Sequence, residues 1–150
     1  MSRFPLFLAT VGTFSLAGCA TIGEMADPLV SQAWALEGIE RPGQEPQYID
    51  PSLGARHTLD FQSDGRLAIQ LDCNRGNSDW SRYDEGYAPP GEGSALRIGE
   101  IASTRALCPR PSFGEEMAAA LPLASGYQIV DGGRTLLLRT RTATYRFTAR

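Results

Sequence analysis

The stretch Leu67-Ala68-Ile69-Gln70-Leu71-Asp72-Cys73-Asn74-Arg75-Gly76 decides the fold. Its apolar side chains recur at every second position as far as Leu71, which is typical of a strand with one buried face. Cys73 continues that phase, so we expect its sulfur to point into the core. Cys108, in a second block over 102–109, is the cysteine that remains to pair with Cys73. We expect this pair to tie the fold together.

The N-terminus has the three-part layout of a secretory signal. Arg3 supplies the positive charge, residues 4–16 are mostly apolar, and Leu16-Ala17-Gly18-Cys19 ends the segment with small residues. The apolar run is too short to span a membrane as a stable helix. Its last four residues resemble the lipobox of bacterial lipoproteins, in which the cysteine is acylated. We therefore predict a signal peptide over 1–18, a lipid anchor such as palmitate on Cys19, and a flexible tether over 19–31.

An ordinary signal peptide with an incidental cysteine is the alternative. More than one acyl chain would anchor the protein stably, since a single chain binds a membrane only marginally. In signals of this kind, Ala20 after the cysteine is compatible with outer-membrane sorting, because no aspartate is present there. The sequence thus predicts a lipid-anchored protein of the bacterial cell envelope, in the outer membrane and facing the periplasm.

The number of cysteines fits this reading. Three cysteines leave an even pair once Cys19 is acylated. Export places Cys73 and Cys108 in an oxidising compartment, where a disulfide is the default. A metal site of both cysteines with His57, the only histidine, is disfavoured, because no two of these residues have close metal-ligand spacing. We therefore expect a single disulfide, no metal and no cofactor.

Composition sets further bounds. The 150 residues, 42% hydrophobic and 21% charged, suit one compact domain, and 16 glycines with 10 prolines favour turns and short strands. A formal net charge of −3 argues against general binding of nucleic acid. We expect a monomer.

Strand and turn signals follow one another along the chain. We expect a first strand over 32–39, a loop rich in proline and glycine over 40–55, and a hairpin of strands 58–62 and 66–71 around Ser63-Asp64-Gly65. Further strands are expected over 77–83, 95–98, 126–130, 135–139 and 144–148. Ser112-Phe113-Gly114-Glu115 is a capping-box pattern that predicts a helix from Ser112, with an apolar stripe of Phe113, Met117 and Leu121.

The most specific residues are Cys73-Asn74 and Ala102-Ser103-Thr104-Arg105-Ala106-Leu107-Cys108-Pro109. Together with a tryptophan-bearing first strand (Trp34) and the Asp-Gly hairpin, they resemble the META domain, the HslJ-like family of small envelope proteins, over 32–150. The resemblance implies an α+β, mostly β fold: a compact antiparallel sheet or partly closed barrel of about seven or eight short strands with one or two short helices. The family commonly has glycine where this chain has Asp72; Gly76 is expected to meet the same need for a positive φ. The resemblance also implies a loose association with envelope stress and antibiotic tolerance, without an agreed molecular role.

The sequence favours a protein without catalytic activity. His57 has no Gly-x-Ser-x-Gly elbow to accompany it, which disfavours a serine hydrolase. Glu115 and Glu116 lie in the first turn of the expected helix, where the helix dipole explains acidic residues. A glycan-directed hydrolase is the distant alternative, because 17 acids nominate no particular carboxylate pair.

Two groups of residues are candidates for binding a partner. Trp80, Arg82, Tyr83 and Tyr87 gather aromatic and cationic groups beside a loop rich in glycine and proline, which suits stacking on a sugar ring or a protein surface. The alternative places Trp80 and one tyrosine in the core. The second group is the set of arginines near the C-terminus, which would meet anionic headgroups or glycans, or else form a solvated outer face: Arg134, Arg139, Arg141, Arg146 and Arg150.

Short polar side chains beside the expected disulfide, such as Asn74, Ser103 and Thr104, are expected to satisfy irregular backbone groups. Arg105 is a candidate partner for Asp72. The sequence as a whole predicts a non-catalytic envelope lipoprotein that binds or protects an envelope protein or glycan and is linked to envelope stress or antibiotic tolerance. A purely structural stress-tolerance scaffold is the alternative.

Overall fold

The computed structural model of the protein describes residues 27–83 and 93–150, so the predicted signal peptide and Cys19 lie outside the described residues. Its long strands are β1 (Trp34–Glu40), β3 (His57–Phe61), β4 (Arg66–Leu71), β5 (Asn74–Arg82), β6 (Ser94–Ile98), β8 (Ala124–Val130), β9 (Thr135–Thr140) and β10 (Thr144–Ala149). Two-residue strands, β2 (Gln47–Tyr48) and β7 (Ala102–Ser103), pair with β1 and β5. The helices are α1 (Pro51–Gly54) and α2 (Gly114–Ala120), with 3-10 turns η1 (Leu121–Leu123) and η2 (Asp131–Gly133).

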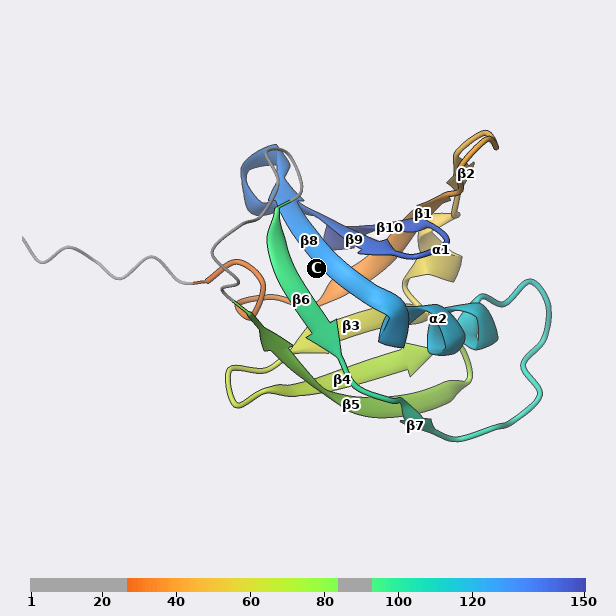
Figure 1. The fold of residues 1–150 in the computed structure, drawn as a ribbon. Coiled ribbons are helices and arrows are strands. Elements are labelled where there is room, and N and C mark those ends of the chain that lie inside the picture. Colours follow the sequence, from red (N-terminus) through yellow and green to blue (C-terminus); the bar gives the residue numbers. More distant parts are fainter. Residues whose placement is uncertain (1–26, 84–92) are drawn as a thin grey trace, which may run out of the picture.

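Within the described residues, eight antiparallel strands close into a barrel (Figure 1). The order is β1-β10-β9-β8-β6-β5-β4-β3, and β3 pairs with β1 to complete the ring. A closed barrel leaves no long edge strand unpaired. The predicted mostly β fold with short helices and one disulfide is therefore confirmed, and its barrel is fully closed.

The β3–β4 hairpin shows how the sequence specifies this barrel. Phe61 pairs with Leu67 across the turn, and Gly65 takes a φ of +86°, as the Asp-Gly signal predicts. Side chains on one face of both strands are buried, because successive residues of a strand point to opposite faces. The inward side chains of this hairpin belong to the same core cluster as Tyr145 and Phe147 of β10.

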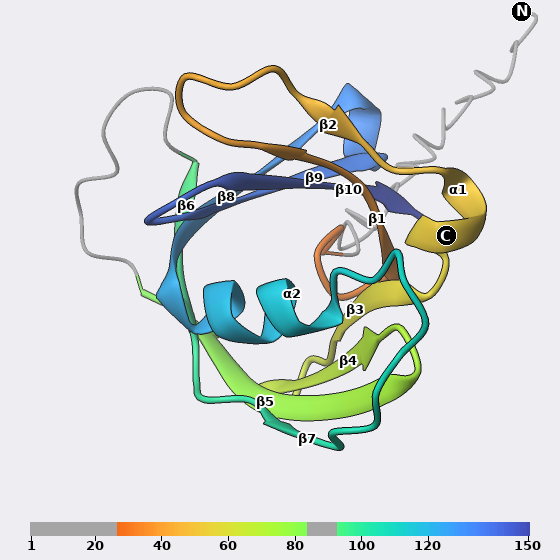
Figure 2. The same cartoon turned by 90° about the vertical axis from the view of Figure 1, so that its right-hand side faces the viewer.

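The two ends of the barrel are covered by different segments (Figure 2). Helix α2 lies across one end and continues into η1; Met117 of α2 and Leu121 of η1 are fully buried, which confirms the predicted apolar stripe at these two positions. The turn over 27–31 lies at the other end, where Leu29 is 0% exposed and its carbonyl accepts the Trp34 Nε1–H at 3.1 Å. The tether predicted over 19–31 therefore ends earlier, because Leu29 packs into the barrel and the folded domain begins before residue 32.

The turn between β4 and β5 corrects the prediction for Cys73. Leu71 pairs with Asn74 across a two-residue turn of Asp72 and Cys73. Asp72 has a φ of +64°, the positive value that the first residue of a type II′ hairpin turn requires and that glycine usually supplies. Asp72, and not Gly76 within β5, therefore takes that role. Because the turn lifts Cys73 out of the strand, Cys73 is exposed and the disulfide lies at the surface rather than across the core.

Two further local predictions are wrong. The loop expected over 40–55 contains β2 and α1. Helix α2 begins at Gly114, two residues later than predicted, and the Ser112 hydroxyl lies 3.5 Å from the Gly114 N–H instead of forming the capping box. The Phe113 N–H donates to His57 Nε2 at 3.0 Å, so a distant side chain does what the local capping sequence was expected to do.

Candidate functional site

The structure places Trp80 and Arg82 in contact with each other, but both side chains also make contacts with other residues of the fold. Trp80 Nε1–H donates to the Gln62 carbonyl at 3.0 Å, and its ring meets Phe61 edge to face with centroids 5.2 Å apart. The Arg82 guanidinium lies 5.4 Å from the Trp80 ring centroid and pairs with Asp27. These contacts favour the core interpretation for Trp80.

The other two members of the predicted cluster, Tyr83 and Tyr87, give little information about binding. Tyr83 is 39% exposed, and Tyr87 lies outside the described residues.

The second predicted group, the C-terminal arginines, is partly neutralised. Arg146 pairs with Glu37 at 2.8 Å and with Asp131 at 3.4 Å, which raises the Arg146 pKa, chiefly through its hydrogen bond to Glu37. The solvated outer face therefore explains Arg146.

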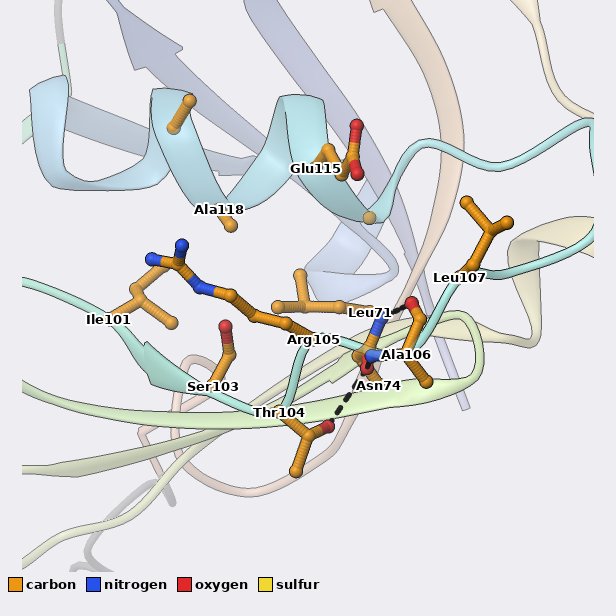
Figure 3. Close-up of a pocket in the computed structure, with 12 residues that line it drawn as sticks. Leu71, Asn74, Ile101, Ser103, Thr104, Arg105, Ala106, Leu107, Glu115 and Ala118 are labelled. Atoms are coloured by element: carbon orange, nitrogen blue, oxygen red, sulfur yellow. Dashed lines mark hydrogen bonds between the residues drawn. The ribbon is translucent and has the colours of Figure 1, made fainter.

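A better-formed site lies on another part of the barrel. A cleft of about 470 Å³ opens between α2 and the segment 101–107 (Figure 3). Its lining combines apolar and polar groups: Leu71, Asn74, Ile101, Ser103, Thr104, Arg105, Ala106, Leu107, Gly114, Glu115, Ala118 and Ala119. It continues beside the disulfide into a hollow of about 80 Å³ that Arg110 also lines.

Asn74 holds the outer wall of this cleft in place. Its Nδ2 donates to the Ala106 carbonyl at 2.9 Å, while its Oδ1 accepts the Ala106 N–H at 2.7 Å and the Thr104 hydroxyl at 3.0 Å. Figure 3 shows the amide of Asn74 reaching from β5 to this segment. Such fully used, largely buried side chains fix irregular backbone. The predicted structural role of Asn74 and Thr104 agrees with these bonds.

A disulfide and a glycine complete the outer wall. Cys73 and Cys108 are linked, as predicted, and the bond ties the end of the segment to the β4–β5 turn. At Gly76, a Cβ atom would lie only 2.9 Å from the Ile101 side chain, so a residue without a side chain lets the segment pack against β5. The outer wall is thus held at both ends and in its middle.

The inner wall, α2, is fixed by a buried histidine and by close packing. His57 is 0% exposed; its Nε2 accepts from Phe113 N–H, and its Nδ1 lies 2.9 Å from the Leu53 carbonyl. The first contact makes Nε2 the acceptor and Nδ1–H the donor of a neutral ring. A Cβ at Gly114 would lie 2.5 Å from the Leu71 carbonyl oxygen, so α2 rests directly on the end of β4. His57 is therefore a structural clamp.

The opposite face of α2 is tied to the barrel wall by Glu116. It accepts from Arg41 at 2.6 Å and from the Tyr145 hydroxyl at 3.1 Å. Burial raises the pKa of Tyr145 above its usual value, and the charge of the Glu116 carboxylate raises it further. Tyr145 is therefore a neutral donor to Glu116 at physiological pH.

Asp72 has a different partner from the one expected. Its Oδ1 accepts from Arg56 at 2.6 Å, and Arg105 makes no contact with it. The side chain of Asp72 is 1% exposed, and its Oδ2 has no hydrogen-bond partner among the described residues. This ion pair helps to hold the positive-φ turn that carries Cys73.

Three charged side chains of the cleft are left unpaired. Among the described residues, Arg105, Arg110 and Glu115 make no ion pair. In Figure 3 the side chain of Arg105 extends along the cleft below Ala118. Leu107, on the same wall, is 96% exposed. The backbone of this wall is pinned, whereas its Arg105 and Leu107 side chains are presented to solvent.

Sequence reasoning noticed the block over 102–109 but assigned all of it to structure. This assignment suits Thr104 and Cys108, whereas the side chains of Arg105 and Leu107 face solvent. The available signal in the sequence was a block that places the large side chains of Arg105 and Leu107 among small residues just before Cys108. Which side chains of the two walls face each other across the cleft depends on where α2 packs, and the local sequence does not specify that position.

The described residues offer neither a metal-binding cluster nor a helix that could span a membrane. In the described ranges 27–83 and 93–150, no group of three His, Cys, Asp or Glu side chains is placed to hold a metal ion. Across the same ranges, no helix has the length and apolar character needed to span a membrane.

Two solved structures share the fold. The NMR structure of a protein from Burkholderia xenovorans has a TM-score of 0.58 at 17% identity, covering 100% of this chain and 99% of that one. The crystal structure of a DUF4847 family protein from Bacteroides vulgatus ATCC 8482 has a TM-score of 0.54 at 14% identity, covering 80% and 93%. These likenesses concern the fold alone.

A search of curated proteins found no match. The family model described as META domain matches residues 27–150, starting where the packed turn around Leu29 starts. This agreement confirms the resemblance carried by Cys73-Asn74 and by the block over 102–109. The chain belongs to the META domain family.

Proposed function

We propose that this protein is a non-catalytic, lipid-anchored protein of the bacterial cell envelope, and that its META domain binds an envelope component in the cleft beside α2. The signal-like N-terminus supports export, and a surface disulfide suits an oxidising compartment. The burial of His57, with both ring nitrogens directed at backbone groups, removes the chain's single histidine as a general base for the cleft. A role in envelope stress or antibiotic tolerance is part of the proposal.

One observation carries the binding proposal. A disulfide and three hydrogen bonds of Asn74 hold the outer wall rigid, yet Arg105 and Leu107 project from it without partners in the described residues. Rigid surfaces bind with a smaller loss of conformational entropy than mobile ones. Arginine is also among the residues that contribute most to interfaces. This combination is expected of a preformed binding surface.

Photo-crosslinking in growing cells tests the binding proposal. A photoreactive amino acid replaces Leu107 in the full chain, and a matched variant carries it at Tyr48, which is 80% exposed on β2, across the barrel from β7 (Figure 2). We expect a specific envelope adduct at position 107 that is absent at position 48 and is lost with Arg105→Glu. If position 107 gives no specific adduct under several envelope stresses, the purely structural scaffold is the better explanation.

The proposed anchor has its own test. Cys19→Ala should move the protein from the membrane fraction to the soluble fraction and remove the acyl mass from its N-terminal peptide. Unchanged fractionation together with an unchanged mass would refute the anchor. Cell fractionation and mass spectrometry of the purified protein measure the two outcomes.

A further inference from the structure

The outer wall of the cleft is the edge of a sheet. Within the described residues, β7 pairs with β5 on one side and with no strand on the other. Beyond β7 the chain still follows β5, because Thr104 N–H donates to the Arg75 carbonyl at 3.0 Å and Ala106 N–H donates to Asn74 Oδ1 at 2.7 Å. Regular strand structure ends at Ser103, and these two hydrogen bonds keep the segment beside β5 as far as Ala106.

Alternate backbone groups of this edge are open. Neighbouring residues of an extended chain direct their N–H and C=O groups to opposite sides. Since Thr104 and Ala106 face β5, Arg105 and Leu107 face away from it. In keeping with this, the N–H groups of Arg105 and Leu107 donate no hydrogen bond to any described residue. An open edge of this kind is a template for one more strand.

The charges at this edge favour an acidic partner. Arg105 lines the cleft and Arg110 lines its extension, whereas Glu115 is the single acid of the lining. None of the three is neutralised by another described residue. Opposite charges placed across neighbouring strands stabilise their pairing. A guanidinium also binds a carboxylate through two parallel hydrogen bonds, which fixes its orientation.

The cleft beside the edge has room for an apolar side chain of the same partner. Its walls include Ile101 and Ala118, and the exposed Leu107 stands at its rim. Residues two apart in a strand face the same side. A segment with an acidic and an apolar residue two positions apart can therefore place the acid at Arg105 and the apolar group beside Leu107 or Ile101.

We infer that the edge over 103–107 binds an extended acidic segment of a partner protein as an added strand. This inference rests on the proposed binding function and names the chemical class of its ligand. The partner's backbone pairs with the open groups of Arg105 and Leu107, and its carboxylate is held by the Arg105 guanidinium. The pinned wall supplies the strand edge in its binding conformation before the partner arrives.

Peptide binding to the full chain, purified in detergent, tests the inference. The probe is a short, capped, threonine-rich peptide with glutamate and leucine two positions apart; its counterpart has lysine in place of glutamate. Fluorescence anisotropy should show that the glutamate peptide binds at least about tenfold more tightly, the factor expected when one charge-assisted contact is lost. Arg105→Glu should reverse this preference, whereas Arg141→Glu, at an exposed arginine outside the cleft, should leave it unchanged.

Methylation of the peptide's backbone nitrogens tests strand pairing without altering the protein. Methyl groups on one alternating set of nitrogens should abolish binding, and methyl groups on the other set should leave it intact, because one set faces the edge. Equal effects of the two sets would overturn strand addition. Equal affinity for the acidic and basic peptides, or no binding of either, would overturn the inference as well.

The photo-crosslinking experiment separates this inference from the proposed function. If an adduct forms at position 107 and a glycan or lipid mass remains on the crosslinked peptide after protease digestion, the cleft binds a ligand and the peptide inference fails. If no adduct forms, the binding function itself fails. An adduct that yields an acidic peptide on digestion, together with the predicted methylation pattern, supports both.

Discussion

At the scale of single residues, Tyr145 links the barrel wall to α2. Its hydroxyl donates to Glu116, and burial, reinforced by the Glu116 charge, raises its pKa above the ordinary value of 10.0. A group whose pKa is higher in the folded state stabilises the fold fully below the unfolded value, and this contribution is lost as the pH rises towards the folded value. Tyr145 therefore makes the fold sensitive to alkaline pH and leaves it insensitive near neutrality.

We expect the free energy of unfolding to fall as the pH rises above about 10, where tyrosine ionises in the unfolded chain. Tyr145→Phe should flatten this decline and should cost about 1 kcal/mol at neutral pH through loss of one hydrogen bond. Urea unfolding at a series of pH values measures both effects. Tyr48→Phe is the matched control at an exposed tyrosine. A decline that survives in Tyr145→Phe but disappears in Tyr48→Phe would contradict this assignment.

At the scale of elements, the outer wall of the cleft has little regular structure to stabilise it. β7 has two residues, and no helix or strand follows until α2 begins at Gly114. The wall therefore depends on Asn74 and on the Cys73–Cys108 bond, which joins residues 35 positions apart. In the chain-entropy model, closing a loop of that length stabilises the fold by about 4 kcal/mol.

Replacing both cysteines with serine should lower the free energy of unfolding by up to about 4 kcal/mol, and the wall should loosen more than the barrel. Hydrogen exchange read by mass spectrometry should show faster exchange over 104–112 than over β3 and β4. Reduction of the native protein should give the same pattern. A uniform increase in exchange along the chain would mean that the bond stabilises the whole barrel and not this segment in particular.

The elements also show where sequence reasoning succeeds. Alternation with a clear turn signal predicted the β3–β4 hairpin, because both sources of information are local. The turn at Asp72 was missed, because an aspartate with a positive φ is held there by Arg56, 16 residues away. The start of α2 was misplaced for a similar reason, since His57 supplies its N-terminal contact. The cleft combines these two non-local effects, so its shape could not be predicted from local sequence.

At the scale of the whole molecule, the barrel has two unlike ends. The turn around Leu29 fills one, and α2 with the cleft occupies the other (Figures 1 and 2). The proposed anchor at Cys19 precedes Asp27 by eight positions (27 − 19). Eight residues span at most about 30 Å when fully extended. A lipid at Cys19 would thus keep the Leu29 end close to the membrane and turn the cleft away from it.

This orientation gives a prediction for the lipidated full chain in vesicles. A fluorescent amino acid at Ser31, an exposed position at the Leu29 end, should be quenched strongly by lipids that carry a quencher in their headgroups. The same amino acid at Leu107 should be quenched much less, because the barrel separates it from the anchor. Equal quenching at both positions would mean that the barrel lies on its side, with the cleft beside the membrane. The distinction matters for the partner: a cleft that faces away from the anchor is open to an acidic segment of a periplasmic protein, whereas a cleft at the membrane surface would meet anionic headgroups first.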